Sequence, residues 1–220
     1  MSAQASQILP NGRVLRYTYR ERMIHWAAAI SYIYLMLTGL AFWSPWLFWI
    51  AIALGGGTVS RQLHPWMGLI FTVATFMMYS MWGAQMKKSE SDKAFWDAVP
   101  HYIRNEDDQV PSAGRFNAGQ KLLFWGFFWC GVALLVTGLI LWFTNLIPWN
   151  LRFLRLFAVI VHPVAALLTI GLFIIHVYMG TAMERGAFGS VIRGDVSVGW
   201  AKRYHRVWYD QLLRNSAAKK

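Results

Sequence analysis

Four of the six histidines lie in or at the ends of long apolar stretches: His25, His64, His162 and His176. Imidazole is a common metal ligand and proton carrier. An ionisable side chain in an apolar segment of membrane length is costly, so it usually has a partner or a function. Any one of these histidines alone could serve a hydrogen bond between helices. The four together indicate a binding site.

The stretches that carry the histidines are long enough to cross a bilayer. Four segments lack Asp, Glu, Lys and Arg, and each exceeds the roughly 20 residues that span about 30 Å of hydrocarbon. We therefore predict a single membrane domain, residues 1–220, with a tail at 184–220 and spans near 23–43, 63–86, 122–147 and 156–183. The chain is 56% hydrophobic and only 14% charged, whereas soluble domains carry about 25% charged residues.

The basic residues predict the orientation. Of 21 Lys and Arg residues, eighteen precede the first span, link the second to the third, or follow the fourth. Only Arg61, Arg152 and Arg155 fall on the other side. Cytoplasmic loops carry the excess of Lys and Arg, so both termini are predicted to be cytoplasmic. The net charge of +11 then reflects membrane topology, and no nucleic-acid partner is expected.

Depth sorts the four histidines into two layers. His162 and His176 lie fourteen residues apart on the fourth span, which places them on one helix face about 21 Å apart. His176 and His25 lie near the cytoplasmic ends of their spans, and His162 and His64 near the outer ends. Depth alone therefore pairs His25 with His176 and His64 with His162.

Two imidazoles per layer suit haem better than zinc. Zinc takes three or four ligands at one point, whereas six-coordinate haem iron takes one nitrogen on each face, and such iron transfers electrons. The sequence thus predicts an all-α membrane protein, a four-transmembrane-helix bundle holding two stacked haems b. Gly39, fourteen residues after His25, would let the backbone pass close to the outer haem, although small-residue helix packing explains it equally well. A more remote alternative is a histidine-relay transporter or proton channel.

The segments outside the spans give weaker expectations. Pro45–Gly57 is too short to span and is expected along the interface, and Ala94–Ile103 is expected to be amphipathic. His101 and His205 are expected to face solvent or headgroups. The tail aromatics read as an anchor to anionic lipid: Trp200, Tyr204, Trp208 and Tyr209. The single cysteine, Cys130, excludes an intrachain disulfide and an iron–sulfur cluster. No internal repeat is evident.

A quinone site is predicted where the third span begins. Asn117 and Gln120 can donate to a carbonyl, and Gly119 allows close approach of the backbone. An apolar wall follows at once, level with His25 and His176. The alternative for Asn117 is a helix N-cap.

Taken together, these residues resemble the gamma subunit, cytochrome b556, of respiratory membrane-bound formate dehydrogenase. The resemblance extends nearly end to end. It rests on the four histidines together with short motifs: His25-Trp26, Leu63-His64-Pro65, Phe116–Lys121, Leu135–Gly138 and Trp200-Ala201-Lys202. It implies that His25, His64, His162 and His176 ligate two haems b, and that Asn117 and Gly119 match the quinone site, with His176 close by. It also implies an iron–sulfur (beta) subunit with one transmembrane helix and a molybdenum or tungsten catalytic (alpha) subunit.

The predicted function is therefore electron transfer in the bacterial inner membrane. Electrons would pass from a periplasmic iron–sulfur subunit through two haems b to menaquinone or ubiquinone on the cytoplasmic side. Formate oxidation itself would occur on another subunit, so this chain would be an electron-transfer and quinone-reducing subunit surrounded by membrane lipid. The nearest alternative is the cytochrome b subunit of a hydrogenase or thiosulfate reductase.

Overall fold

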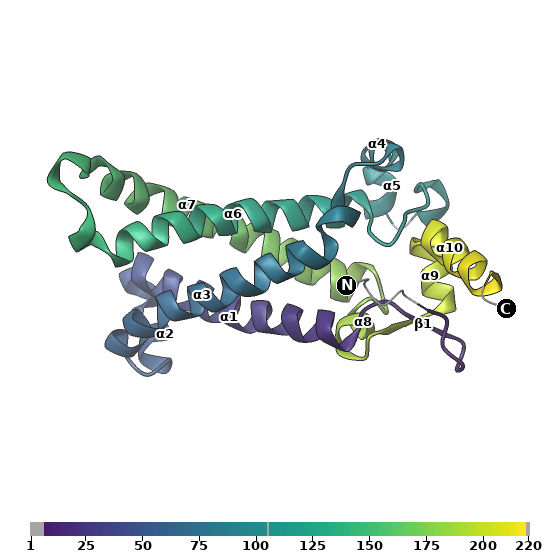
Figure 1. Ribbon diagram of the computed structural model, residues 1–220, viewed down its shortest axis with the longest axis horizontal. Coiled ribbons are helices and arrows are strands. Elements are labelled where there is room, and N and C mark those ends of the chain that lie inside the picture. Colours follow the sequence, from purple (N-terminus) through teal and green to yellow (C-terminus); the bar gives the residue numbers. More distant parts are fainter. Residues whose placement is uncertain (1–6, 105, 219–220) are drawn as a thin grey trace. The chain divides into compact units, whose positions relative to one another are not determined.

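The computed structural model is predominantly helical and describes residues 7–104 and 106–218 (Figure 1). The ends of the predicted domain, 1–6 and 219–220, lie outside the described residues, as does residue 105. The helices are α1 (Tyr19–Trp43), α2 (Phe48–Ala53), α3 (Gly57–Trp82), α4 (Glu90–Asp97), α5 (Val99–Ile103), α6 (Ala118–Trp142), α7 (Phe153–Tyr178), α8 (Phe188–Ile192), α9 (Val198–Tyr204) and α10 (Arg206–Ala217), and the strands are β1 (Arg13–Leu15) and β2 (Asp195–Ser197).

Four of the described helical segments are long and apolar enough to cross a membrane, as predicted. They are Tyr19–Trp43, Gly57–Met86, Ala118–Trp142 and Trp149–Met183. Their bounds differ from the predicted spans because a helix does not have to stop where charge begins. Helix α1 begins at Tyr19 and α3 at Gly57, so both include charged residues that the apolar stretches leave out.

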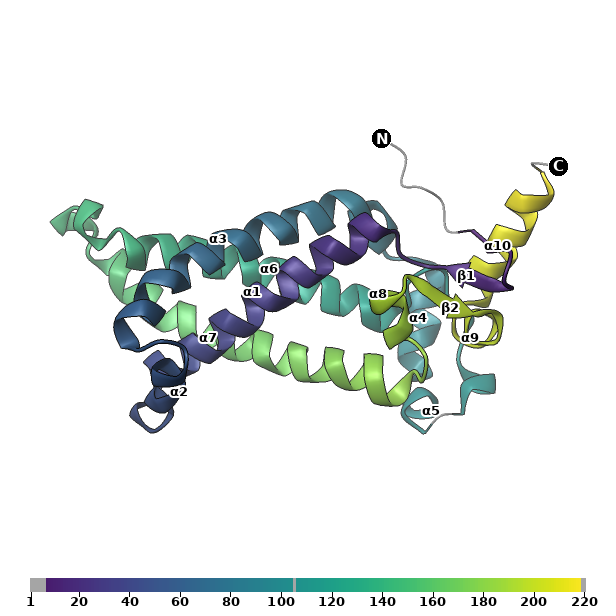
Figure 2. The same cartoon turned by 90° about the horizontal axis from the view of Figure 1, so that it is seen from below.

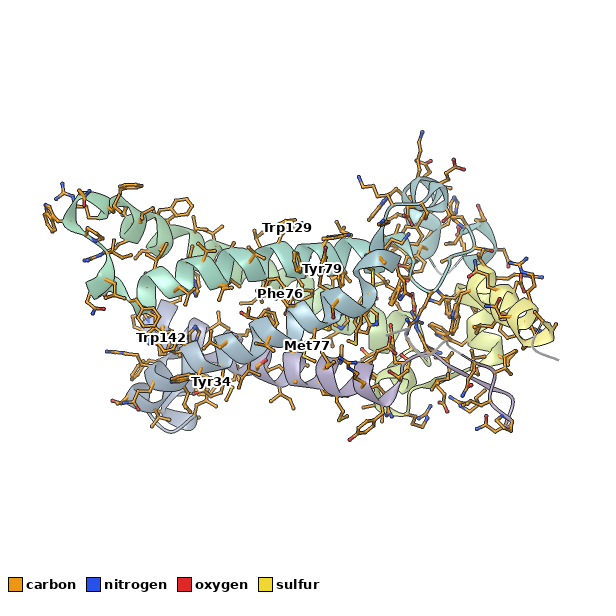
Figure 3. All side chains as sticks on the ribbon, in the orientation of Figure 1. Tyr34, Phe76, Met77, Tyr79, Trp129 and Trp142 are labelled. Carbon is orange, nitrogen blue, oxygen red and sulfur yellow. The ribbon has the colours of Figure 1, made fainter. Side chains whose placement is uncertain are left out.

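The long helices present large apolar side chains on their outer faces. Trp129 of α6 is 61% exposed and Leu156 of α7 is 66% exposed. Figure 3 shows all the side chains and labels Trp129 and Phe76, both of them exposed. Contiguous apolar surface of this kind is rare on proteins that face water. These faces suit contact with lipid.

The chain divides into two compact units. The apolar unit comprises Ile24–Tyr79 and Gly126–Ile174, and within it segments of all four long helices run alongside one another (Figures 1 and 2). Tyr32 of α1 lies at their centre. Its hydroxyl donates to Thr169 Oγ1 of α7 at 3.2 Å, and its ring lies 5.3–5.8 Å from the rings of Phe71, Phe127 and Phe173. One buried tyrosine therefore contacts the other three helices.

The polar unit comprises Met1–Met23, Ser80–Trp125 and Ile175–Lys220. Strand β1 pairs with β2 in antiparallel register, with Val14 opposite Val196. These valines belong to a hydrophobic cluster: Val14, Val196, Trp200, Ala201, Trp208, Tyr209 and Leu212. The predicted lipid anchor is therefore wrong for Trp200, Trp208 and Tyr209, which are 4–7% exposed. Their helical spacing suits a buried face as well as a lipid one, and β1 supplies the surface that covers it.

The two segments expected to be short are short. Helix α2 ends at Ala53, and the turn that follows contains Gly55 and Gly56, whose φ angles of 100° and 99° favour glycine. The expected amphipathic piece around Ala94–Ile103 consists of two helices, α4 and α5. The break is at Ala98, because Pro100 is accommodated only in the first turn of α5.

Candidate functional site

The outer pair of histidines comes together as depth predicts. His64 on α3 and His162 on α7 lie in the apolar unit, with their ring centroids 6.4 Å apart and their planes at 57°. Both rings project from the interior of long helices, and a proline follows each of them. Two imidazoles from facing helices therefore approach one point.

Each ring is held by a buried threonine. Thr38 Oγ1 lies 2.7 Å from His64 Nδ1, and Thr137 Oγ1 lies 2.8 Å from His162 Nδ1. Each hydroxyl donates its single hydrogen to a carbonyl of its own helix, at Tyr34 and Ala133. The threonine oxygen must therefore accept a hydrogen from the imidazole. This pattern assigns the hydrogen to Nδ1 of both rings and leaves the lone pair on Nε2, as a metal ligand requires.

The spacing of the rings fits one metal with two axial imidazoles. A ligand nitrogen lies about 2 Å from a metal and an imidazole centre roughly 1 Å further out, which puts two opposed rings about 6 Å apart. The observed 6.4 Å agrees with that distance. Among the described residues, no group of three or more His, Cys, Asp or Glu side chains is placed to hold a metal ion. The outer pair thus fits a haem iron.

A glycine faces each histidine of the outer pair. A Cβ on Gly39 of α1 would lie 3.9 Å from His64 Cε1, and a Cβ on Gly138 of α6 would lie 3.3 Å from His162 Cε1. The second distance is tighter than ordinary contact, so a side chain at Gly138 would push against the ring. Gly39 lies at the outer layer, as its spacing from His25 predicts.

The two halves of the outer site share a short sequence pattern. Thr38-Gly39 precedes His64-Pro65, and Thr137-Gly138 precedes His162-Pro163, at nearly the same interval. No internal repeat was evident from the sequence, since the recurring units are only two residues long. The recurrence of Thr-Gly and then His-Pro was the signal that could have identified the two threonines.

The inner pair stays a prediction. His25 of α1 belongs to the apolar unit, with its ring edge-on to Trp26 at 5.8 Å. His176 of α7 belongs to the polar unit. His25 lies in the second turn of α1 and His176 in the last turn of α7.

The predicted quinone residues form the start of α6. Gln120 N donates to Asn117 Oδ1 at 2.9 Å, and Asn117 N donates to Gln120 Oε1 at 3.2 Å. This reciprocal pair is a capping box, so Asn117 does cap the helix. Its amide nitrogen points elsewhere and donates to Glu184 Oε1 at 3.4 Å. A Cβ on Gly119 would meet Asn117 Oδ1 at 3.4 Å and Phe95 at 3.8 Å.

Glu184 and Tyr102 are site residues that the sequence analysis missed. Glu184 is 4% exposed, and its Oε1 accepts a hydrogen bond of 2.5 Å from the Tyr102 hydroxyl. Burial and the neighbouring Glu184 raise the pKa of Tyr102 far above its usual range. The available signal was an acidic residue directly after the fourth apolar stretch, eight residues beyond His176.

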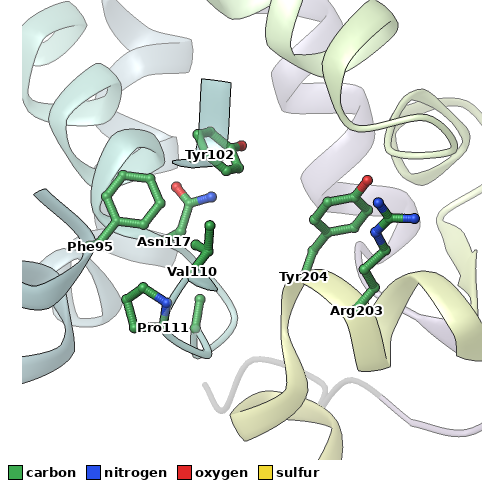
Figure 4. A pocket seen from close by; sticks show the side chains of 8 residues that line it. Phe95, Tyr102, Val110, Pro111, Asn117, Arg203 and Tyr204 are labelled. Atoms are coloured by element: carbon green, nitrogen blue, oxygen red, sulfur yellow. The ribbon is translucent and has the colours of Figure 1, made fainter. Parts of the chain in front are cut away.

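A recess opens beside these residues. Its empty volume is about 320 Å³, including the part open to solvent. Figure 4 shows Tyr102 and Asn117 facing Tyr204 and Arg203 across it. The side chains that line it come from α4, α5, α9 and the loop before α6: Phe95, Tyr102, Val110, Pro111, Ala113, Asn117, Arg203 and Tyr204.

The two remaining histidines differ from each other. His101 is half-exposed and pairs with Glu106 at 2.6 Å, in agreement with its predicted solvent contact. The same prediction is wrong for His205, which is fully buried and donates through Nδ1 to the Gly114 carbonyl at 2.6 Å. Burial and the nearby Arg16 lower the pKa of His205 well below its usual value, so it is a neutral structural residue.

Comparison with known proteins adds a decisive observation. Residues 16–194, which include all four histidines of the apolar stretches, match the family described as prokaryotic cytochrome b561. The chain belongs to this family. It is therefore an integral membrane cytochrome b that transfers electrons, and haem b is the cofactor that its outer histidines fit.

Relatives of this cytochrome agree with the predicted resemblance. The nitrate-inducible formate dehydrogenase cytochrome b556(Fdn) subunit of Escherichia coli K12 is 29% identical over 209 residues, 94% of either chain. The cytochrome b556(fdo) subunit of formate dehydrogenase from the same organism is 31% identical over 209 residues, 94% of this chain and 96% of that one. The formate dehydrogenase cytochrome b556 subunit of Haemophilus influenzae is 29% identical over 206 residues, 92% of this chain and 85% of that one.

Proposed function

We propose that this cytochrome is the membrane subunit of a formate dehydrogenase. It would carry electrons from a periplasmic iron–sulfur subunit through two haems b to a quinone on the cytoplasmic side. The observation that carries the proposal is the His64–His162 pair, with its threonine-held rings 6.4 Å apart. The names of the relatives, all formate dehydrogenase cytochrome b556 subunits, favour this donor over a hydrogenase or a thiosulfate reductase.

At the outer site, His64 and His162 would hold haem b through Nε2. When bound, the haem would supply a one-electron carrier. Thr38 and Thr137 keep each ring in the ligating tautomer and in one orientation. Gly39 and Gly138 keep the space beside each ring clear.

At the inner site, His25 and His176 would hold the second haem b. His162 and His176 both belong to α7, and their fourteen-residue separation predicts two layers about 21 Å apart. One helix would then contribute a ligand to each haem. The excess of Lys and Arg on the side of His25 and His176 supports cytoplasmic termini in the bacterial inner membrane.

The quinone, menaquinone or ubiquinone, would bind near the inner haem at Asn117, Gly119 and Gln120. The side-chain oxygen of Asn117 caps the start of α6, and its side-chain nitrogen donates to a second partner. An inward electron works against about 2.3 kcal/mol per 100 mV of membrane potential. The donor must therefore be strongly reducing, which formate is. The molybdenum or tungsten alpha subunit would oxidise formate, and the beta subunit, with one transmembrane helix, would pass the electrons on.

The test uses the purified complex with variants at each histidine. Two haems b per chain are expected, with low-spin bis-histidine spectra, and formate should reduce both. His64→Ala or His162→Ala should remove one haem, and His25→Ala or His176→Ala should remove the other. Less than about one haem per folded chain, or a crossed pattern of losses, would overturn the proposed ligation. Haems that formate leaves oxidised would overturn the proposed donor.

A further inference from the structure

Glu184 is a buried carboxyl group that the proposed electron path does not use. It lies directly after the π-helical turn Met179–Met183 at the end of the fourth span and is 4% exposed. Burying a carboxyl group is costly unless it is hydrogen-bonded or has a function. One of its oxygens, Oε1, accepts from two side chains, the Tyr102 hydroxyl at 2.5 Å and the Asn117 amide at 3.4 Å.

These two partners connect Glu184 to two different places. Tyr102 lines the recess that opens to solvent, so water can reach the neighbourhood of its hydroxyl (Figure 4). Asn117 is the residue proposed to hold the quinone. Glu184 therefore lies between a source of protons and a proposed consumer of protons.

We propose that Glu184 delivers the protons consumed in quinone reduction and is reloaded from water in the recess through the Tyr102 hydroxyl. This inference rests on the proposed function. Each quinone takes two electrons, one at a time from the inner haem, and two protons, one on each carbonyl oxygen, to give the quinol. At each transfer Glu184 gives up a proton and becomes a carboxylate, and a proton from the solvent then restores it, so two protons are taken up for each quinol.

The reloading step involves both hydrogen-bonded groups at once. The Tyr102 hydroxyl passes its proton to Glu184 Oε1 while the tyrosine oxygen takes a proton from water in the recess, and that water regains a proton from the bulk solvent. Because burial and Glu184 raise the pKa of Tyr102, a free tyrosinate is unfavourable and the two transfers occur together. The other polar and charged side chains that line the recess are Asn117, directly before α6, and Arg203 and Tyr204 of α9. Arg203 brings a positive charge to the recess.

The experiment measures haem oxidation by a soluble quinone analogue in the formate-reduced complex, by stopped flow between pH 5.5 and pH 9. In Glu184→Gln, we expect formate-driven haem reduction to be unchanged and haem oxidation by quinone to slow by about 10²-fold. The remaining rate should fall roughly tenfold per pH unit, because the protons must then come directly from hydronium ions, and its solvent isotope effect should rise. Glu184→Asp should recover part of the rate. Glu106→Gln changes a half-exposed carboxylate just after α5, the helix that carries Tyr102. It should behave like the unmodified protein.

The outcomes separate this inference from the proposed function. Equal rates and pH profiles in Glu184→Gln and the unmodified complex would overturn the role of Glu184 and leave the quinone site intact. An unmodified complex whose reduced haems are not oxidised by quinone would overturn both. Should Glu184→Gln lose haem, Tyr102→Phe tests the same path with the carboxyl group in place. It should retain both haems and show the slow, pH-dependent oxidation, and a normal profile would overturn the inference.

Discussion

Thr38 and Thr137 determine which nitrogen of each outer histidine can bind a metal. Both are almost fully buried, at 0% and 2% exposure. A hydrogen bond from Nδ1 to such an oxygen makes the opposite nitrogen a stronger donor. A stronger donor stabilises ferric over ferrous iron, so these bonds should lower the reduction potential of the outer haem.

Thr137→Val removes this bond with little change in shape. We expect the midpoint potential of one haem to rise by on the order of 30–60 mV, given 59 mV per tenfold change for one electron. The unpaired Nδ1–H should also cost about 1–3 kcal/mol of stability. Redox titration with visible spectroscopy measures both haems together.

Two controls accompany this variant. Thr137→Ser keeps the hydroxyl and should keep the potential. Thr72→Val removes a hydroxyl of α3 that donates to the Gly68 carbonyl, so it should leave both potentials unchanged. Equal shifts in the two haems after Thr137→Val would show that the effect is general and does not act through His162.

The two glycines beside the outer histidines differ in the space they leave. Gly138→Ala places a Cβ at 3.3 Å from His162, whereas Gly39→Ala places one at 3.9 Å from His64. We expect Gly138→Ala to lower the content of the outer haem several-fold, because the ring must tilt away from its ligating position. Gly39→Ala should lower the haem content less. Haem content and low-spin absorbance measure this, and the reverse order would contradict it.

At the scale of elements, buried ion pairs join segments that are distant in sequence. Arg115 donates to Glu21 Oε1 at 2.7 Å, and Trp82 donates to the same oxygen at 2.6 Å. Lys121 at the start of α6 pairs with Asp92 of α4 at 2.8 Å. These contacts fasten the start of α1 to the end of α3 and to the loop before α6, and they fasten α4 to the first turn of α6.

The Asp92–Lys121 pair predicts a dependence on pH. Burial raises the pKa of Asp92, but the hydrogen bonds from Lys121 and Ser89 lower it by more than burial raises it, so the net shift is downward. A carboxyl group whose pKa is lower in the folded state stabilises the folded protein at pH values above its unfolded pKa. This stability is lost as the pH falls through the folded pKa. Asp92→Asn should therefore cost about 1 kcal/mol near pH 7 and progressively less below pH 4.

The measurement is the thermal transition followed by tryptophan fluorescence in detergent between pH 3 and pH 8. Asp97→Asn, at an exposed position of the same helix, is the matched control and should leave the transition unchanged. A loss in Asp92→Asn that is the same at every pH would show that the charge of Asp92 is not the cause.

The elements were easier to predict than their contacts. Apolar length predicted four long helices, and depth predicted the pairing of His64 with His162, because both depend on position along one helix. The contacts of Thr38, Thr137 and Glu184 were missed because each joins residues that are far apart in sequence. Aromatic spacing alone could not show that Trp200 and Trp208 are covered by β1.

At the scale of the whole molecule, the three basic residues of the predicted outer side differ in their contacts and exposure. Arg155 donates to the Ile147 carbonyl at 2.8 Å and also to the Thr144 carbonyl, so it holds the turn between α6 and α7. Arg152 lies over the ring of Trp149 at 4.7 Å and is exposed. Arg61, in the first turns of α3, is also exposed. Arg61 and Arg152 are therefore the residues that we expect to meet the proposed iron–sulfur subunit.

Reversing both charges, as Arg61→Glu with Arg152→Glu, should weaken recovery of the partner subunits in a pull-down at low salt. Haem content should not change. We expect a several-fold loss that shrinks as the ionic strength rises, since salt screens exposed charges over about 10 Å at 0.1 M. Unchanged recovery together with unchanged haem reduction would show that these arginines meet headgroups.

The repeated Thr-Gly and His-Pro pattern has a consequence for how firmly the outer metal is held. Each face of the iron would meet an imidazole of the same tautomer, steadied by the same hydroxyl and beside the same small residue. Neither bond would then be the weaker one, so neither ligand is predisposed to leave and admit oxygen or another small molecule. Converting this site from a carrier of electrons into a site of ligand exchange would require breaking that equivalence on one face.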